Sequence, residues 1–289
     1  MSRGAIQERK IQILKSDLLN FSWLVHGFST RNGGHSSAFG GAALNLGFGK
    51  NDARASVEQN RAAFLRQLDE TNHWRLITAR QVHSDVVHEI TAPDSHPTGD
   101  ALITNTPGLL LAIQTADCLP LLIADAKRHA VGAVHAGWRG TLARIAVKTI
   151  GEMRRAFGST AEDLRVAIGP GIHACCYVVG PEVREEFESQ FATAGDWFRE
   201  VRQSDPVREK YPLLFLHARP PGHGPEETKL YLDLVAANTQ QLVEAGVRPK
   251  NIDASPLCTS CRTDLLFSYR AEKGNTGRLM GVIGLRSRR

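Results

Sequence analysis

The sequence predicts a single layered domain of mixed α and β structure (α/β, or α+β). Short apolar runs bounded by turn residues are typical of buried strands, and they alternate with segments whose apolar residues recur at the helical period. Strands and helices are interspersed throughout, with no internal repeat and no clear linker, which favours one domain built of packed layers. A chain of 289 residues is long enough to bury one large core.

The first half of the chain contains the clearest strands. Residues 31–50 are rich in glycine, serine and asparagine, which predicts loops and turns. Asp52 is a suitable N-cap for a helix whose apolar positions, from Val57 to Leu68, follow helical spacing. Continuous apolar runs then predict three central strands, at Leu109–Ile113, Leu119–Ile123 and Val131–Val134.

The second half alternates helix and strand. The apolar positions and caps predict helices over Thr141–Phe157, from Pro181 onwards, and over Leu232–Ala245 with Gly246 as its stop. Strands are predicted at Leu164–Ile168 and Gly281–Leu285. Residues 192–229 are polar and rich in proline and show no period, which predicts a long loop excursion.

Composition excludes several classes of protein. Hydrophobic residues make up 42% and charged residues 22%, as in ordinary globular proteins. The net charge of +5 comes without a basic stripe interleaved with aromatic residues, so no nucleic-acid partner is expected. The polar N-terminus and the lack of a long apolar run predict a cytoplasmic protein with no membrane segment. Residues 286–289 are interpreted as a solvated basic tail.

Two histidines and a cysteine each lie beside a predicted strand. His83 follows Gln81-Val82, Cys118 precedes the strand at Leu119–Ile123, and His135 follows the run Val131–Val134. Five cysteines in a chain expected to be cytoplasmic favour metal binding or catalysis over disulfides. The three residues are ligand types for a zinc ion with one open coordination position. Each of them taken alone also fits an ordinary core position.

Arginines near these residues predict an anion site. Arg139 lies in His135-Ala136-Gly137-Trp138-Arg139-Gly140, at the expected start of a helix, where its guanidinium adds to the unbonded backbone N–H groups. Arg61 falls on the apolar face of the helix after Asp52, and an inward arginine usually has an anionic partner. That partner is either a structural carboxylate or a substrate phosphate.

A series of motifs along the chain carries a family resemblance. In order they are Leu44-Asn45-Leu46-Gly47, Asn60-Arg61, Gln81-Val82-His83, Gly99-Asp100-Ala101, Thr115-Ala116-Asp117-Cys118-Leu119-Pro120, His135 to Gly140, Gly169-Pro170-Gly171-Ile172, Cys175-Cys176-Tyr177, Cys258-Thr259, Phe267-Ser268-Tyr269-Arg270 and Thr276-Gly277-Arg278. Together they resemble the YfiH family, also called the laccase-domain or polyphenol oxidase family, to which purine nucleoside phosphorylase activity is assigned. The chain departs from the family pattern at Ser84, where a glycine is usual.

The resemblance implies a fold, a metal and a reaction. The fold is a layered α/β/α sandwich with a mixed β-sheet, with a single catalytic domain over residues 27–285 after an N-terminal segment over residues 1–26. The metal is Zn²⁺, bound by His83, Cys118 and His135. The reaction is phosphorolysis of adenosine, inosine and 5′-methylthioadenosine, with adenosine deamination as a second activity.

This chemistry suggests roles for further residues. In phosphorolysis, phosphate attacks the anomeric carbon of the ribose while the purine leaves, so cationic or N–H donors are needed for the phosphate, and Arg61, Arg139 and Asn45 are candidates. Asp117 is expected either to act as the acid/base or to orient a ligand histidine. Gln81 is expected to hydrogen-bond the purine edge or the ribose.

Other functions remain open, because they use the same residues. A soft Cys/His site also binds Cu²⁺, as a copper-containing polyphenol oxidase requires, although the 11 histidines include no His-x-His pair. Cys118 could instead be the catalytic nucleophile of a hydrolase, with His135 or His83 as its base. Cell-wall (peptidoglycan) precursors would be the substrates, and a metal-stabilised binding module is the remaining alternative. A monomer or a small homo-oligomer is expected.

Overall fold

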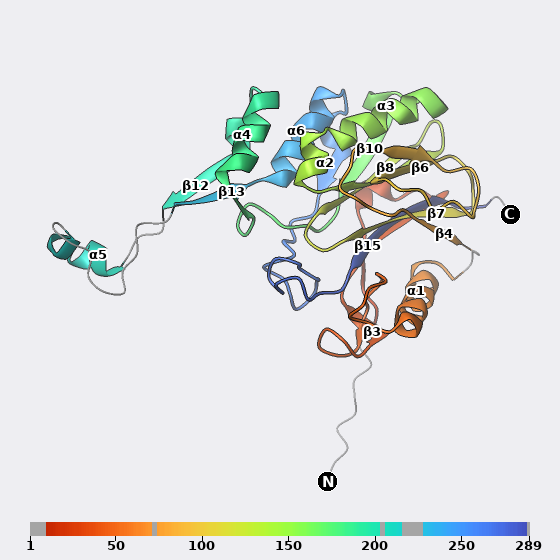
Figure 1. Cartoon of the computed structure of the whole chain (residues 1–289). Helices are drawn as coiled ribbons and strands as arrows, with labels where there is room; N and C mark the ends of the chain where they lie inside the picture. The colour runs from red at the N-terminus through yellow and green to blue at the C-terminus, as the bar shows by residue number, and fades with distance from the viewer. Residues whose placement is uncertain (1–9, 71–73, 203–205, 216–227, 288–289) are drawn as a thin grey trace, which may run out of the picture. The chain divides into compact units, whose positions relative to one another are not determined.

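The computed structural model describes residues 10–70, 74–202, 206–215 and 228–287 (Figure 1). Its contacts divide the chain into two compact units. Unit 1 comprises Met1–His173 and Leu234–Arg289, and unit 2 comprises Ala174–Asp233. Each unit is described by itself below.

Unit 1 contains a five-stranded sheet in the order β1-β2-β15-β7-β4. All neighbours in this sheet are antiparallel except β4 and β7, which run parallel. The central β15 carries glycines at positions 281 and 284, where side chains and backbone of neighbouring strands approach closely. The strands are β1 (Ile13–Leu14), β2 (Leu24–Ser29), β4 (Arg75–Thr78), β7 (Leu109–Thr115) and β15 (Leu279–Leu285).

A second, six-stranded sheet of unit 1 has the order β14-β10-β8-β9-β6-β5. Its centre is the antiparallel hairpin of β8 and β9, and its outermost pairs are parallel. Every residue of β8 and β9 is buried, as expected for continuous apolar runs. The strands are β5 (Val87–Glu89), β6 (Ala101–Thr104), β8 (Leu119–Asp125), β9 (Ala130–Ala136), β10 (Leu164–Ile168) and β14 (Ile252–Ala254).

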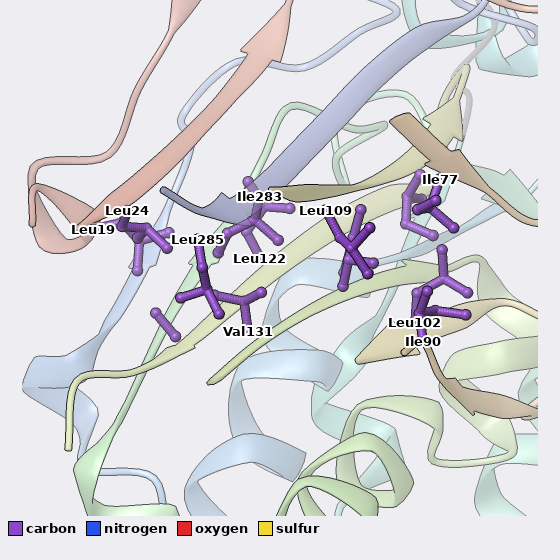
Figure 2. Packing of buried hydrophobic residues seen from close by; sticks show 14 of the residues in the cluster. Leu19, Leu24, Ile77, Ile90, Leu102, Leu109, Leu122, Val131, Ile283 and Leu285 are labelled. Atoms are coloured by element: carbon purple, nitrogen blue, oxygen red, sulfur yellow. The ribbon is translucent and has the colours of Figure 1, made fainter. Parts of the chain in front are cut away.

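The two sheets pack face to face, and the main hydrophobic core lies between them (Figure 2). One face of the core comes from β2, β4, β7 and β15 and the other from β6, β8, β9 and β10. The five strands predicted from apolar runs therefore all exist, and each lies in the interior of one of these sheets. Residues shared by the core and labelled in Figure 2 include Ile77, Leu102, Leu122, Val131 and Ile283.

Helices cover the outer faces of this pair of sheets. The helix α1 (Arg54–Leu68) packs Phe64 and Leu68 into a second core cluster with residues of β2, β7 and β15. On the other side α3 (Ile145–Phe157) contacts β5, β6 and β9, and α6 (Leu234–Glu244) packs against α3 (Figure 1). The predicted layered α/β fold is thus confirmed, with two stacked sheets between the helical layers. No helix in the described ranges is long and apolar enough to cross a membrane.

The helix predicted over Thr141–Phe157 is in fact two helices. The short α2 (Trp138–Leu142) ends before Arg144, whose φ of 61° lies in the left-handed region, and α3 then begins at Ile145. The carbonyl of Thr141, which a continuous helix would use internally, accepts hydrogen bonds from the Arg144 N–H and from Nε2 of Gln241 on α6, both at 3.0 Å. A side chain from a distant helix therefore supports the break, and local periodicity could not reveal it.

Short elements complete unit 1. The strand β3 (Asn32–Ser36) lies within the predicted loop over residues 31–50. Single 3₁₀ turns lie at η1 (Asp17–Leu19), η2 (Ala161–Asp163) and η5 (Pro249–Asn251). Asp52 lies one residue before the observed N-cap of α1, where its carboxylate accepts the backbone N–H of Ala53.

Unit 2 is built on a three-stranded antiparallel sheet, β11-β13-β12, with the helix α4 (Pro181–Gln190). Phe187 and Phe191 pack with Trp197 in an aromatic cluster. The long loop predicted over residues 192–229 therefore contains regular structure, although 203–205 and 216–227 lie outside the described residues. Most of β12 is exposed, so its sequence lacks the alternation that marks a half-buried strand. The elements are β11 (Val178–Val179), η3 (Ala194–Trp197), β12 (Phe198–Arg202), α5 (Pro206–Lys210), η4 (Pro212–Phe215) and β13 (Thr228–Leu232).

A buried histidine makes the stability of this fold dependent on pH. His26 on β2 accepts the backbone N–H of Ser16 at Nε2, and burial together with the nearby Lys15 lowers its pKa to about 4. The unfolded chain binds this proton below about pH 6.5, whereas the folded chain does not until about pH 4. The free energy of unfolding should therefore fall by about 2–3 kcal/mol between pH 6.5 and 4 through His26 alone.

We expect His26→Gln to remove this part of the pH dependence, because a glutamine still accepts the Ser16 N–H but takes up no proton. Urea unfolding of the wild type and the variant at pH 4.5, 5.5 and 7.0 measures the difference. The exposed His35 provides the matched control His35→Gln, which should keep the wild-type slope. Parallel pH profiles of wild type and His26→Gln would contradict the assignment.

Candidate functional site

The three predicted metal ligands converge where strands of unit 1 end. Cys118 directly precedes β8 and His135 is the last residue but one of β9, and these strands pair so that Leu119 faces Ala136. His83 lies in the connection between β4 and β5. In an antiparallel pair, one strand begins where its neighbour ends. Cys118, at the start of β8, therefore lies next to His135, at the end of β9, and the connection that carries His83 passes this end of the two strands.

The geometry of these three residues, called the ligand trio below, fits a single metal ion. One ligand atom from each residue lies within 4.8 Å of the other two, and Cys118 Sγ is 3.9 Å from His83 Nε2. The His83 and His135 rings meet edge to face with centroids 4.9 Å apart. A Cβ on Gly137 would come within 2.9 Å of Cys118 Sγ and 3.2 Å of His83 Cδ2, so a glycine leaves room for the trio.

Asp100 holds the ligand trio in place. It is fully buried just before β6, and its Oδ1 accepts a hydrogen bond from His135 Nδ1 at 2.8 Å. This bond directs Nε2 of His135 towards the other ligands. The same carboxylate accepts the backbone N–H groups of Val82, His83 and Ser84, at 3.2, 3.1 and 2.6 Å. His83 itself has a φ of 60°, an uncommon conformation that these bonds stabilise.

No role was predicted for Asp100 from the sequence, although it lies in the motif Gly99-Asp100-Ala101. One feature of the sequence pointed to it, namely a carboxylate directly before a buried strand. A carboxylate at such a position loses its water and must be hydrogen-bonded by the protein instead. The unusual Ser84 also contacts Asp100, because its hydroxyl donates to Oδ2 at 2.7 Å. The departure from glycine at position 84 therefore adds a hydrogen bond behind the ligand trio.

Electrostatics within the trio favour a thiolate. Burial opposes the charged form of Cys118, but His135 and His83 outweigh it and lower the pKa of the thiol to about 6. Burial likewise disfavours the His135 imidazolium, but the Cys118 thiolate and Asp100 raise the pKa of His135 to about 9. For Asp100 too, burial opposes ionisation, while the hydrogen bonds from His135 and Ser84 lower its pKa. A metal cation would take the place of the His135 proton in stabilising the thiolate.

The donor set decides which metals fit. One thiolate and two imidazole nitrogens suit zinc, and three protein ligands leave a coordination position for a substrate or water. The same donors accept copper, so the set alone does not separate the two ions. The trio, with its ligand atoms within 4.8 Å of one another, is of a size to hold one ion.

Asp117 lies beside Cys118 but bonds elsewhere. Its two oxygens accept the Thr259 hydroxyl and the Arg270 backbone N–H, each at 2.6 Å, and its own carbonyl accepts the N–H of Ile172. In the structure, then, the carboxylate that orients a ligand histidine belongs to Asp100, and Asp117 ties together the loops behind Cys118. The structure places Thr259, from the predicted Cys258-Thr259 motif, in this same network.

Two predicted substrate-binding amides also have protein partners. The Gln81 side chain makes two hydrogen bonds with the backbone of Gln114 on β7, its Nε2 donating and its Oε1 accepting, both at 2.8 Å. The buried Asn45 bonds Gly47 through both ends of its amide, and it also contacts Asp52 and the N–H of Arg278. Both amides therefore already make hydrogen bonds within the protein.

The two predicted anion-binding arginines lie in different settings. Arg139 is an exposed residue of α2, with its guanidinium stacked 4.4 Å above the Trp138 ring. Arg61 is half-buried on α1, donates from Nε to the Leu46 carbonyl at 2.9 Å and stacks 4.2 Å above the Phe48 ring. The sequence left two anionic partners open for Arg61, a structural carboxylate or a substrate phosphate. Among the described residues, no carboxylate pairs with Arg61.

We expect Asp100→Asn to weaken metal binding, because an amide presents either an N–H or a weaker acceptor to His135 and loses the charge that stabilises its ligand orientation. Loss of such an outer carboxylate typically lowers metal affinity about 10- to 100-fold. Zinc affinity is measured by competition with a chromophoric chelator. Asp85→Asn, at a half-buried carboxylate paired with Lys148, is the matched control and should bind zinc like the wild type. Equal affinity in the Asp100 and Asp85 variants would refute the role of Asp100.

Comparison with known proteins supports one family for the chain. The family described as multi-copper polyphenol oxidoreductase laccase matches residues 25–286. The chain is 38% identical over 263 residues to a protein of Deinococcus radiodurans named purine nucleoside phosphorylase, with 90% of this chain and 88% of that protein covered. It is 33% identical over 278 residues to purine nucleoside phosphorylase YlmD of Geobacillus stearothermophilus, with 92% of each covered.

The fold agrees with solved structures of such proteins. The crystal structure of the hypothetical protein YfiH of Bacillus licheniformis superposes with a TM-score of 0.77 at 32% sequence identity, covering 91% of this chain and 93% of that one. The family match over residues 25–286 runs from β2 to β15 and includes every residue of the ligand trio. The chain therefore belongs to the multi-copper polyphenol oxidoreductase laccase family, the YfiH family that its sequence motifs resemble.

Proposed function

We propose that this protein is a zinc-dependent purine nucleoside phosphorylase acting on adenosine, inosine and 5′-methylthioadenosine, with adenosine deamination as a second activity. The observation that carries the proposal is the ligand trio His83, Cys118 and His135, held by a buried carboxylate. Relatives at 38% and 33% identity named purine nucleoside phosphorylase support the reaction class. Phosphate is the second substrate, and a cytoplasmic monomer or small homo-oligomer without nucleic-acid or membrane partners is part of the proposal.

His83, Cys118 and His135 would hold the zinc ion, which when bound supplies Lewis-acid chemistry at the substrate. The chain's own contribution is the orientation of these ligands. Asp100 keeps the His135 proton on Nδ1, so Nε2 is available as a ligand. Ser84 and the backbone N–H groups of residues 82–84 in turn fix the Asp100 carboxylate.

Arg61 and Arg139 are the proposed cations for the attacking phosphate, since a guanidinium binds phosphate with two parallel hydrogen bonds. Gln81 and Asn45 act here by positioning, because their amides already bond the protein backbone. We favour an anchoring role for Asp117 over proton transfer, because both of its oxygens already accept short hydrogen bonds.

Product analysis tests the reaction. Purified zinc-containing protein incubated with adenosine should release adenine and ribose 1-phosphate only when phosphate is present. Deamination should form inosine without phosphate as well, and phosphorolysis should convert part of this inosine to hypoxanthine when phosphate is added. Chromatography of the products with and without phosphate separates the two reactions. Bound zinc without any turnover of purine nucleosides would overturn the proposal and direct attention to hydrolysis of cell-wall precursors.

We expect Cys118→Ala to lose both zinc and activity, because it removes one of three ligands. Metal content by mass spectrometry and turnover of adenosine are measured on the same sample, with the exposed-residue variant His96→Ala as control. The alternative role of Cys118 as a nucleophile is favoured by its lowered pKa of about 6. A Cys118→Ala protein that keeps stoichiometric zinc but loses turnover would support that alternative and contradict the ligand assignment.

A further inference from the structure

A polar cavity of unit 1 lies next to the loop that follows β3. Its volume is about 250 Å³, which suits a small anion with water better than a whole nucleoside. It is formed by two segments far apart in the sequence, residues 45–52 and 274–278. The lining residues used below are Asn45, Gly47, Phe48, Lys50, Asp52 and Arg278.

Buried amides fix the shape of this cavity. Asn45 Oδ1 accepts the N–H groups of Gly47 and Arg278, at 3.1 and 2.9 Å, and its Nδ2 donates to Gly47 O and Asp52 Oδ2. Beneath it, the buried Asn60 donates to the Asn45 carbonyl at 2.9 Å. The cavity is therefore preformed, and its walls need no rearrangement to receive a ligand.

Two half-buried arginines lie at or near this cavity, and neither pairs with a carboxylate of the described residues. Arg278 lines it and bonds only the carbonyls of Thr276 and Gly277, at 3.3 and 3.1 Å. Arg61 stacks on Phe48, a lining residue, and the Leu46 peptide joins the two by accepting from Arg61 Nε and donating to the Arg278 carbonyl. Burial and the nearby Arg54 lower the pKa of Arg61 to about 10, as expected for a desolvated cation.

A structural arginine of the same region has a different environment. Arg31 forms a 3.1 Å ion pair with Glu272 and donates to the carbonyls of Thr263, Leu266 and Phe39. The carboxylate of Asp52, which also lines the cavity, is satisfied by Ser36, Asn45 and the Ala53 N–H. The exposed Lys50 adds a further positive charge at the rim. The cavity thus presents two cations, Arg278 and Lys50, and one carboxylate, Asp52, and neither cation forms an ion pair with a carboxylate of the described residues.

Gly47 connects the cavity to the edge that carries the ligand trio. A Cβ at this position would lie 2.6 Å from Arg278 Cγ and 2.9 Å from Gln114 Oε1, so both side chains rest against the glycine. The backbone of Gln114 bonds the side chain of Gln81, two residues before His83. Moreover, Leu279, next to Arg278, pairs with Thr115 at the end of β7, three residues before Cys118.

We propose that Arg278, with Lys50 and Arg61, forms a subsite for a phosphate group in the cavity between residues 45–52 and 274–278. The ligand chemistry is that of a phosphate oxyanion, which comes either from inorganic phosphate or from the phosphate monoester of a pentose. The inference rests on the proposed function for its assignment as the phosphate subsite of phosphorolysis. Anion binding itself depends only on the arginines and the cavity.

Direct binding tests the subsite. Inorganic phosphate and ribose 1-phosphate are each titrated calorimetrically into the zinc-containing wild type, Arg278→Met and the control Arg155→Met, whose residue is exposed on α3 and paired with Glu152. Loss of a charged hydrogen-bond donor should weaken binding of at least one of the two probes about tenfold or more. Arg155→Met should bind like the wild type. Which probe responds identifies the source of the phosphate group.

Gly47→Ala is the second variant, because it pushes on the Arg278 side chain while keeping its charge. It should also weaken phosphate binding, and thermal unfolding checks that both variants are folded. Unchanged affinity for both probes in folded Arg278→Met and Gly47→Ala would overturn the subsite.

Steady-state kinetics separates this inference from the proposed function. If the protein turns over purine nucleosides, Arg278→Met should raise KM for phosphate about tenfold or more, while KM for the nucleoside changes little. Phosphate-dependent turnover with an unchanged KM for phosphate in Arg278→Met would leave the function standing and refute the subsite. Phosphate binding that depends on Arg278 in a protein that does not turn over nucleosides would support the subsite and refute the proposed function.

Discussion

The buried carboxylate of Asp100 is the constraint on which the candidate site depends. An ionised group without solvent must be fully hydrogen-bonded, and Asp100 meets this requirement with His135 Nδ1, the Ser84 hydroxyl and three consecutive backbone N–H groups. These bonds fix the tautomer of one metal ligand and the backbone of another. A single side chain thus determines the geometry of a site whose ligands come from separate parts of the chain.

The surrounding architecture gives this interaction a rigid frame. Asp100, Cys118 and His135 are each next to or within a strand of the six-stranded sheet, and β8 and β9 are buried along their whole length. The loops that complete the site are held by further polar groups with little exposure, Asp117 behind Cys118 and Asn45 with Asn60 beside Arg278. Because buried hydrogen bonds are costly to break, these loops are positioned nearly as firmly as the strands.

The same edge of unit 1 combines two kinds of chemistry. The ligand trio supplies soft and borderline donors for a metal, and the cavity lined by Arg278 supplies a guanidinium group without a carboxylate partner among the described residues. A reaction that joins a neutral nucleoside to an anionic nucleophile needs both kinds of group close together. The two regions are joined by hydrogen bonds between the Gln81 side chain and the Gln114 backbone. A structural change in one region is therefore expected to alter the geometry of the other.

The sequence by itself determined the layered α/β class and the five buried strands, and it singled out the three residues that the structure brings together as the ligand trio, because apolar runs and family motifs are local properties of the chain. It did not determine the break between α2 and α3, which depends on Gln241 from a distant helix, or the pairing of β12 with β13. It also did not reveal that Asp100 rather than Asp117 orients His135, or that the Leu46 backbone bonds both Arg61 and Arg278. Only the tertiary structure decided these points, because each is a contact between residues that the spacing of the sequence does not bring together.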